Sequence, residues 1–70
     1  MSRDAFVEAG ALALYRSEMC HRVAEFEKTQ DSAALIANDF ADFRAKYVRK
    51  FQDIVESLES QGLVVESRAA

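Results

Sequence analysis

Two arginines and two tyrosines form the cluster in this sequence that is best suited to bind an anion. Arg44 lies inside the apolar arc of a predicted helix rather than opposite it, and Arg16 occupies the equivalent place on the preceding helix. Residues equally far from a turn near Gln30 face each other, which places Tyr15 and Tyr47 beside the arginines. Because guanidinium groups bind phosphate oxygens and tyrosine rings stack on bases, the cluster is a candidate phosphate or nucleotide site.

Two structural interpretations of these arginines compete with the ligand site. Like charges on one apolar seam are unfavourable without anionic partners. The long arginine stems can pack on the seam while their guanidinium groups reach carboxylates at its edge, such as Glu18, Asp39 or acids of a second subunit. Alternatively, the arginines form a polar layer that fixes the register of the helices and the geometry of a dimer. The sequence leaves all three interpretations open.

A second candidate site is the basic run over residues 44–50, which carries four positive charges. Lys46, Arg49 and Lys50 spread over about 100° of the polar face of the helix. A nucleic acid or an acidic partner would bind such a patch, and a symmetric dimer would double it. The alternative is a solvated face supported by the pair Asp42 and Lys46. The net charge of −3 argues against a general polyanion binder.

No group of residues in the sequence has the spacing of a catalytic or metal site. Cys20 and His21 are adjacent, so on a helix they point about 100° apart and do not form a nucleophile–base pair. We expect Cys20 to pack as a small apolar residue and His21 to face solvent. Glu18 and Glu25 flank His21, but one histidine with two exposed acids is a pattern of low specificity. We therefore expect no enzyme activity, no metal and no cofactor.

Length and composition predict a single helical domain over residues 1–70. Half of the 70 residues are apolar, there is no proline, and the one cysteine excludes an internal disulfide framework. The apolar stretch over residues 5–15 is interrupted by Glu8 and is too short to span a membrane. The sequence carries no secretory signal. We therefore expect a cytoplasmic protein without a membrane partner.

Capping residues and helix formers predict two helices, over about residues 3–28 and 31–61. Between them, three of the four side chains in residues 29–32 can bond the backbone locally, which favours a turn. Ser2 is the expected N-cap of the first helix, and Thr29 or Asp31 that of the second. Gly62 fits the left-handed position after the second helix, and a short extended tail follows.

The apolar periodicity predicts which faces of the two helices meet. Residues seven apart define the expected contact line of each helix. Asn38 and Asp39 are both good capping residues, so a break in the second helix near this point is an alternative. The expected lines are Ala5, Leu12, Met19 and Phe26 in the first helix, and Phe40, Tyr47 and Ile54 in the second.

The surplus of apolar surface predicts self-association. Two helices joined by a short turn form an antiparallel hairpin, which has no third layer to cover the wide apolar arc of its second helix. Below about 70–80 residues a single core rarely stabilises a fold alone, so a dimeric four-helix bundle is the simplest solution. Small residues around Gly10 would let another helix approach closely. The expected partner or dimer interface comprises Phe6, Val7, Gly10, Leu14, Phe40, Phe43 and Phe51.

These patterns favour a non-catalytic interaction protein. Such a protein would act as an oligomeric regulator, inhibitor or adaptor of another protein, in the manner of small inhibitors encoded by phages or plasmids. The alternatives are a nucleic-acid-binding regulator that uses the basic run, and a nucleotide- or phosphate-binding protein that uses the arginine–tyrosine cluster. The sequence does not identify the partner.

Overall fold

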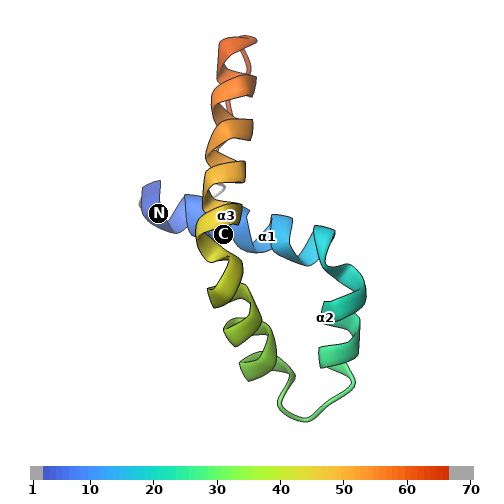
Figure 1. Cartoon of the computed structure of the whole chain (residues 1–70). Coiled ribbons are helices and arrows are strands. Elements are labelled where there is room, and N and C mark those ends of the chain that lie inside the picture. The colour runs from blue at the N-terminus through green and yellow to red at the C-terminus, as the bar shows by residue number, and fades with distance from the viewer. Residues whose placement is uncertain (1–2, 67–70) are drawn as a thin grey trace.

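The computed structural model describes residues 3–66, and within this range the chain forms three α-helices and no strand. The helices are α1 (Arg3–Glu18), α2 (Cys20–Glu27) and α3 (Ser32–Ser60). The longest dimension of the molecule is 43 Å, which is the length of the 29-residue α3 at about 1.5 Å per residue. Helix α1 crosses the middle of α3, and α2 turns away from α1 toward the start of α3 (Figure 1). The predicted all-α class is confirmed.

The single helix expected over residues 3–28 is wrong, because the chain bends at Met19. The backbone angles of Met19 are φ −106° and ψ 29°, outside the α-helical region. Hydrogen bonds from Met19 N to Tyr15 O (2.8 Å) and from Val23 N to Met19 O (2.9 Å) continue across the bend. A straight extension of α1 would leave α3, whereas the bend returns α2 to it and buries Val23.

Helix α3 is continuous through Asn38, so the alternative break there is excluded. It begins at Ser32 and ends at Ser60, within one residue of the predicted bounds. Asp31 occupies the N-cap position without a side-chain hydrogen bond to the backbone. The hydroxyl of Thr29 instead donates to the carbonyl oxygen of Phe26 at 2.8 Å, at the end of α2. The expected cap at Ser2 lies outside the described residues.

The end of α3 has the predicted glycine cap. Gly62 has a φ of 85°, its N–H donates to the carbonyl of Glu59 at 3.0 Å, and the N–H of Leu63 donates to that of Leu58 at 2.9 Å. This pair of bonds is the Schellman arrangement, which requires a residue in the left-handed conformation. Residues 63–66 continue without regular structure, with Val65 half-buried and Val64 exposed.

Replacing Gly62 by alanine is expected to lower the free energy of unfolding by about 1 kcal/mol. No heavy atom lies within 4 Å of the position that the new Cβ would take, so the cost is conformational rather than steric. Chemical denaturation followed by circular dichroism measures it. Gln61→Ala is the matched control, because Gln61 has a φ of −90° that alanine adopts freely. Equal stability of the two variants would contradict the prediction.

The core face of α1 differs from the expected line of residues seven apart. Its buried side chains are Val7, Ala11 and Tyr15, which are four apart, while Ala5 is exposed. A seven-residue repeat suits nearly antiparallel helices, whereas rows of residues four apart pack where helices cross at a steeper angle. The crossing of α1 over α3 therefore explains the correction (Figure 1).

In the rest of the chain, the core follows the predicted arc only in part. Tyr47 is buried as expected, but Ile54 is 43% exposed, whereas the adjacent Val55 is 2% exposed. Cys20, expected to pack in the core, is exposed after the bend, and His21 faces solvent as predicted. The buried side chains of α2 and α3 are Val23, Ile36, Asp39, Tyr47 and Val55.

Candidate functional site

A buried carboxylate joins the three helices. Asp39 of α3 is 6% exposed. Its Oδ2 atom accepts hydrogen bonds from the Tyr15 hydroxyl of α1 at 2.6 Å and from Nε of Arg22 of α2 at 2.9 Å. Nη2 of Arg22 lies 2.8 Å from Oδ1, so the guanidinium group holds both carboxylate oxygens. Both oxygens have partners, and this cluster of Asp39, Tyr15 and Arg22 is a structural centre rather than a reactive one.

The sequence indicates one member of this cluster, the buried Asp39. Asp39 lies on the flank of α3 that carries Ile36 and Phe43, so it belongs to the apolar arc as Arg44 does. Its type and position predict a cap or a carboxylate at the seam, and no pattern in the sequence indicates Arg22 as its partner. Its partnership with Asp39 depends on the bend at Met19, which local sequence does not predict.

Burial and Asp39 together change the acidity of Tyr15. Burial raises the pKa of the Tyr15 hydroxyl to about 12, and the hydrogen bond to the Asp39 carboxylate raises it in the same direction. Burial also raises the pKa of Tyr47, and the charge of Glu18 adds to the effect. The rings of Tyr15 and Tyr47 meet edge to face with centroids 6.0 Å apart. Both hydroxyls are therefore neutral and poorly suited to general-base chemistry at neutral pH.

Alkaline titration tests this environment. Tyr15 is expected to ionise near pH 12 in the native protein, against about 10 in the unfolded chain. The native state then holds this proton more tightly, so stability is retained below about pH 10 and falls as the pH rises through about 12. Tyrosinate absorbance after a rapid pH jump measures the native midpoint. Tyr15→Phe is expected to remove the transition near pH 12, and a native midpoint near 10 for Tyr15 would refute the assignment.

The arginine–tyrosine cluster is only partly brought together. Tyr15 and Tyr47 are in contact, although α1 crosses α3 instead of lying antiparallel to it as in the expected hairpin. The guanidinium group of Arg44 is bound by Glu8, and Arg16 lies 3.7 Å from the carboxylate of Glu27. Both arginines are about half-exposed. Their side chains therefore reach carboxylates at the edge of the helices, although the partners differ from Glu18 and Asp39.

Two residues of the basic run, Lys46 and Lys50, lie beside the ring of Tyr47. Nζ of Lys50 lies 2.8 Å and 3.0 Å from the two carboxylate oxygens of Glu18. This contact lowers the pKa of Glu18 and raises the pKa of Lys50. The ammonium groups of Lys46 and Lys50 also lie 5.3 Å and 5.8 Å from the centre of the Tyr47 ring. Lys46 and Arg49 are exposed, while the charge of Lys50 is matched by an acid of the same chain.

The chain itself covers much of the expected partner interface. The ring of Phe51 packs against Phe6 with centroids 5.4 Å apart and lies directly over Gly10. The close approach at Gly10 was predicted, but the approaching helix is α3 of the same chain. Val7 is buried at 6% exposure. Leu14, Phe40 and Phe43 are half-buried against the core.

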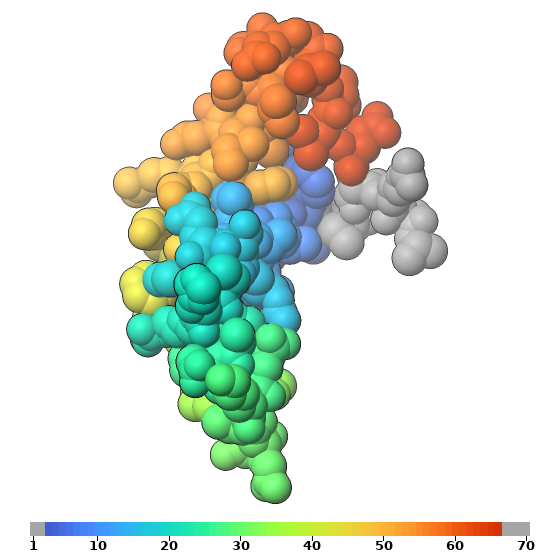
Figure 2. All heavy atoms as spheres, turned by 90° about the vertical axis from the view of Figure 1, so that its right-hand side faces the viewer, coloured from blue at the N-terminus to red at the C-terminus, as the bar shows by residue number. Residues whose placement is uncertain are grey.

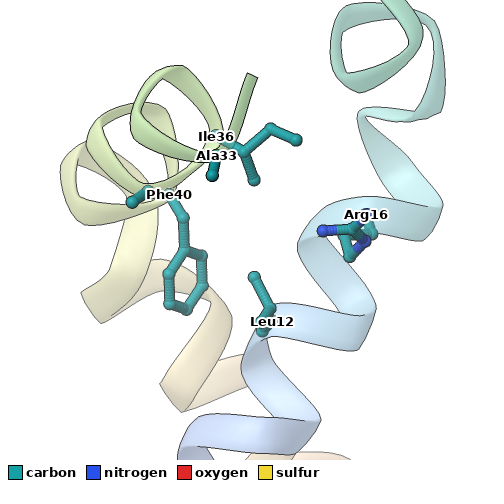
Figure 3. A pocket seen from close by; sticks show the side chains of 6 residues that line it. Leu12, Arg16, Ala33, Ile36 and Phe40 are labelled. Carbon is teal, nitrogen blue, oxygen red and sulfur yellow. The ribbon is translucent and has the colours of Figure 1, made fainter. Parts of the chain in front are cut away.

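An apolar groove opens between α1 and the first half of α3 (Figure 3). Its volume is about 340 Å³. The side chain of Arg16 stands at its edge and is the one charged residue of the lining. Tyr15, Arg44 and Tyr47 are not among its lining residues, so Arg16 is the one member of the predicted anion cluster at this groove. The lining residues are Leu12, Arg16, Ala33, Ile36, Ala37 and Phe40.

Comparisons with protein-family models, curated protein sequences and solved structures found no match. Among residues 3–66, no group of three or more His, Cys, Asp or Glu side chains is placed to hold a metal ion. No helix in the described part of the chain is both long and apolar enough to cross a membrane. Proposals about function therefore depend on the surfaces of the protein itself.

Proposed function

We propose that this protein is a non-catalytic interaction module that forms a homodimer and binds another protein. The observation that supports the proposal is the position of its exposed apolar side chains. In the described part of the chain, the exposed large apolar residues are Ile54, Leu63 and Val64, at 43%, 52% and 75% exposure. Ile54 lies in the last two turns of α3, and Leu63 and Val64 follow the helix after Gly62. We call these three residues the C-terminal apolar patch.

The C-terminal apolar patch lies on the solvent-facing side of the end of α3, whereas Val55 on the same part of the helix is 2% exposed. The end of α3 projects past the crossing with α1 (Figure 1), and its surface stands clear of α1 and α2 in Figure 2. The N–H of Leu63 bonds the carbonyl of Leu58, which places Leu63 at the last turn of α3. Exposed apolar groups that gather on one end of a small protein are typical of a protein-binding surface.

The charges around the patch predict how self-association depends on salt. The charged residues between positions 52 and 60 are Asp53, Glu56 and Glu59, all of them acidic. Two copies that meet through their patches bring these acids near one another. Added salt screens that repulsion, so dimerisation is expected to strengthen with salt, whereas a basic partner protein would bind less tightly. A dimer formed through the end of α3 differs from the predicted four-helix bundle of two antiparallel hairpins, because α1 crosses α3 instead of lying antiparallel to it.

Sedimentation equilibrium at low and high salt tests the proposal. The wild-type protein is expected to have twice the 7.9 kDa mass of the single chain. Ile54→Glu combined with Leu63→Glu is expected to give the single-chain mass with unchanged helicity, because both positions are exposed in the folded chain. Ala45→Glu is the matched control, since Ala45 is an exposed residue of α3 outside the patch. A wild-type protein that stays a well-folded single chain at every concentration and salt would overturn the homodimer.

A further inference from the structure

The apolar groove between α1 and α3 has the dimensions and lining of a small-ligand site. Its volume of about 340 Å³ lies near the lower end of the range of such sites, about 300–1,000 Å³. The floor on α3 includes Ala33 and Ala37, whose short side chains leave the space open. Leu12 from α1 and Phe40 from α3 border it (Figure 3).

The single charged residue of the groove has unused hydrogen-bonding capacity. Arg16 lies 3.7 Å from Glu27, which is an ion pair beyond hydrogen-bond distance, and its side chain is 46% exposed. Arg22, by contrast, donates to Asp39 at 2.9 Å. The guanidinium group of Arg16 therefore keeps N–H donors free at the edge of an apolar surface. A carboxylate placed there would form charge-assisted hydrogen bonds with it.

We propose that this groove binds a monoanionic amphiphile, namely a straight-chain carboxylate of medium length. The alkyl chain lies on Leu12, Ile36 and Phe40, and the carboxylate binds Arg16. Six lining residues are too few for a stable protein interface, which takes about 20–30 residues on each side. The one charge of the lining is positive, which selects an anion. This site is separate from the C-terminal apolar patch, so it goes beyond the proposed function and does not depend on it.

Titration of the whole protein with decanoate at neutral pH, below its critical micelle concentration, tests the site. The methyl NMR signals of Leu12 and Ile36 are expected to shift saturably. Decanol has a chain of the same length without the charge, and we expect it to bind about five- to tenfold more weakly. Octanoate is expected to bind more weakly than decanoate by about two- to fourfold for each methylene removed.

Two variants separate the contributions of charge and space. Arg16→Gln is expected to weaken decanoate binding about five- to tenfold and to leave decanol binding unchanged. Ala37→Trp fills the groove and is expected to abolish saturable binding of both. Ala45→Trp on the same helix, which lies outside the groove, is expected to leave binding unchanged, and circular dichroism verifies that each variant is folded. Equal affinity for decanoate and decanol, undiminished binding to Arg16→Gln, or the absence of saturable shifts at Leu12 and Ile36 would overturn the proposal.

Discussion

Replacing Asp39 by alanine is expected to lower the free energy of unfolding by about 3 kcal/mol. The substitution removes the hydrogen bonds to Tyr15 and Arg22, and it leaves the fully buried Tyr15 hydroxyl without this acceptor. Arg22 is 55% exposed, so water replaces its lost partner and moderates the cost. A single core of this size supplies about 3–5 kcal/mol, so the variant is expected to retain at most about 2 kcal/mol of stability. Thermal denaturation followed by circular dichroism measures the loss.

The matched control for this prediction is Asp42→Ala. Asp42 lies on the same helix and is exposed, so its replacement is expected to change stability by less than about 0.5 kcal/mol. The Tyr15→Phe background isolates the buried hydroxyl, because no unpaired donor remains there when Asp39 is removed. Asp39→Ala is therefore expected to cost less in that background than in the wild type. Similar stability of the Asp39→Ala and Asp42→Ala variants would show that the cluster does not hold the helices together.

Features set by local chemistry were predictable from the sequence. The turn before α3 and the left-handed conformation of Gly62 follow from the preferences of a few neighbouring residues, and both are confirmed. The bounds of α3 were correct to one residue for the same reason. Helix formers without proline also indicated the all-α class. In each case the physical cause lies within a few residues of the feature itself.

Features that depend on how distant helices meet were not predictable. The bend at Met19 has no proline or glycine to mark it, and its benefit is the return of Val23 to the core. The steep crossing of α1 over α3 replaces the expected seven-residue line by a row of residues four apart. The partnership of Arg22 with Asp39 depends on the bend and the crossing together. Periodicity gives the apolar face of a helix but not the angle at which that face meets another.

Replacing Gly10 by leucine is expected to destabilise the protein by about 2 kcal/mol, although leucine favours helix over glycine by about 1 kcal/mol. A Cβ atom at this position would overlap the ring of Phe51 from α3. The ring is also in contact with Phe6, so it cannot move aside without losing that packing. The overlap therefore outweighs the gain in helix propensity. Chemical denaturation measures the difference from wild type, and Ala13→Leu at an exposed position of α1 is the matched control.

In the Phe51→Ala variant, Gly10→Leu is expected to raise the free energy of unfolding instead of lowering it. Without the ring, the leucine side chain enters the vacated space and the helix propensity of α1 improves. Gly10→Leu is then expected to stabilise the protein by about 1 kcal/mol relative to Phe51→Ala alone. A loss of similar size in both backgrounds would mean that the backbone of α1 at Gly10, rather than contact with α3, sets the requirement for glycine. A change from destabilisation to stabilisation would show that the approach of α3 within one chain requires glycine at position 10. A dimer interface at Gly10 would instead give the same effect of Gly10→Leu with and without Phe51 of the same chain.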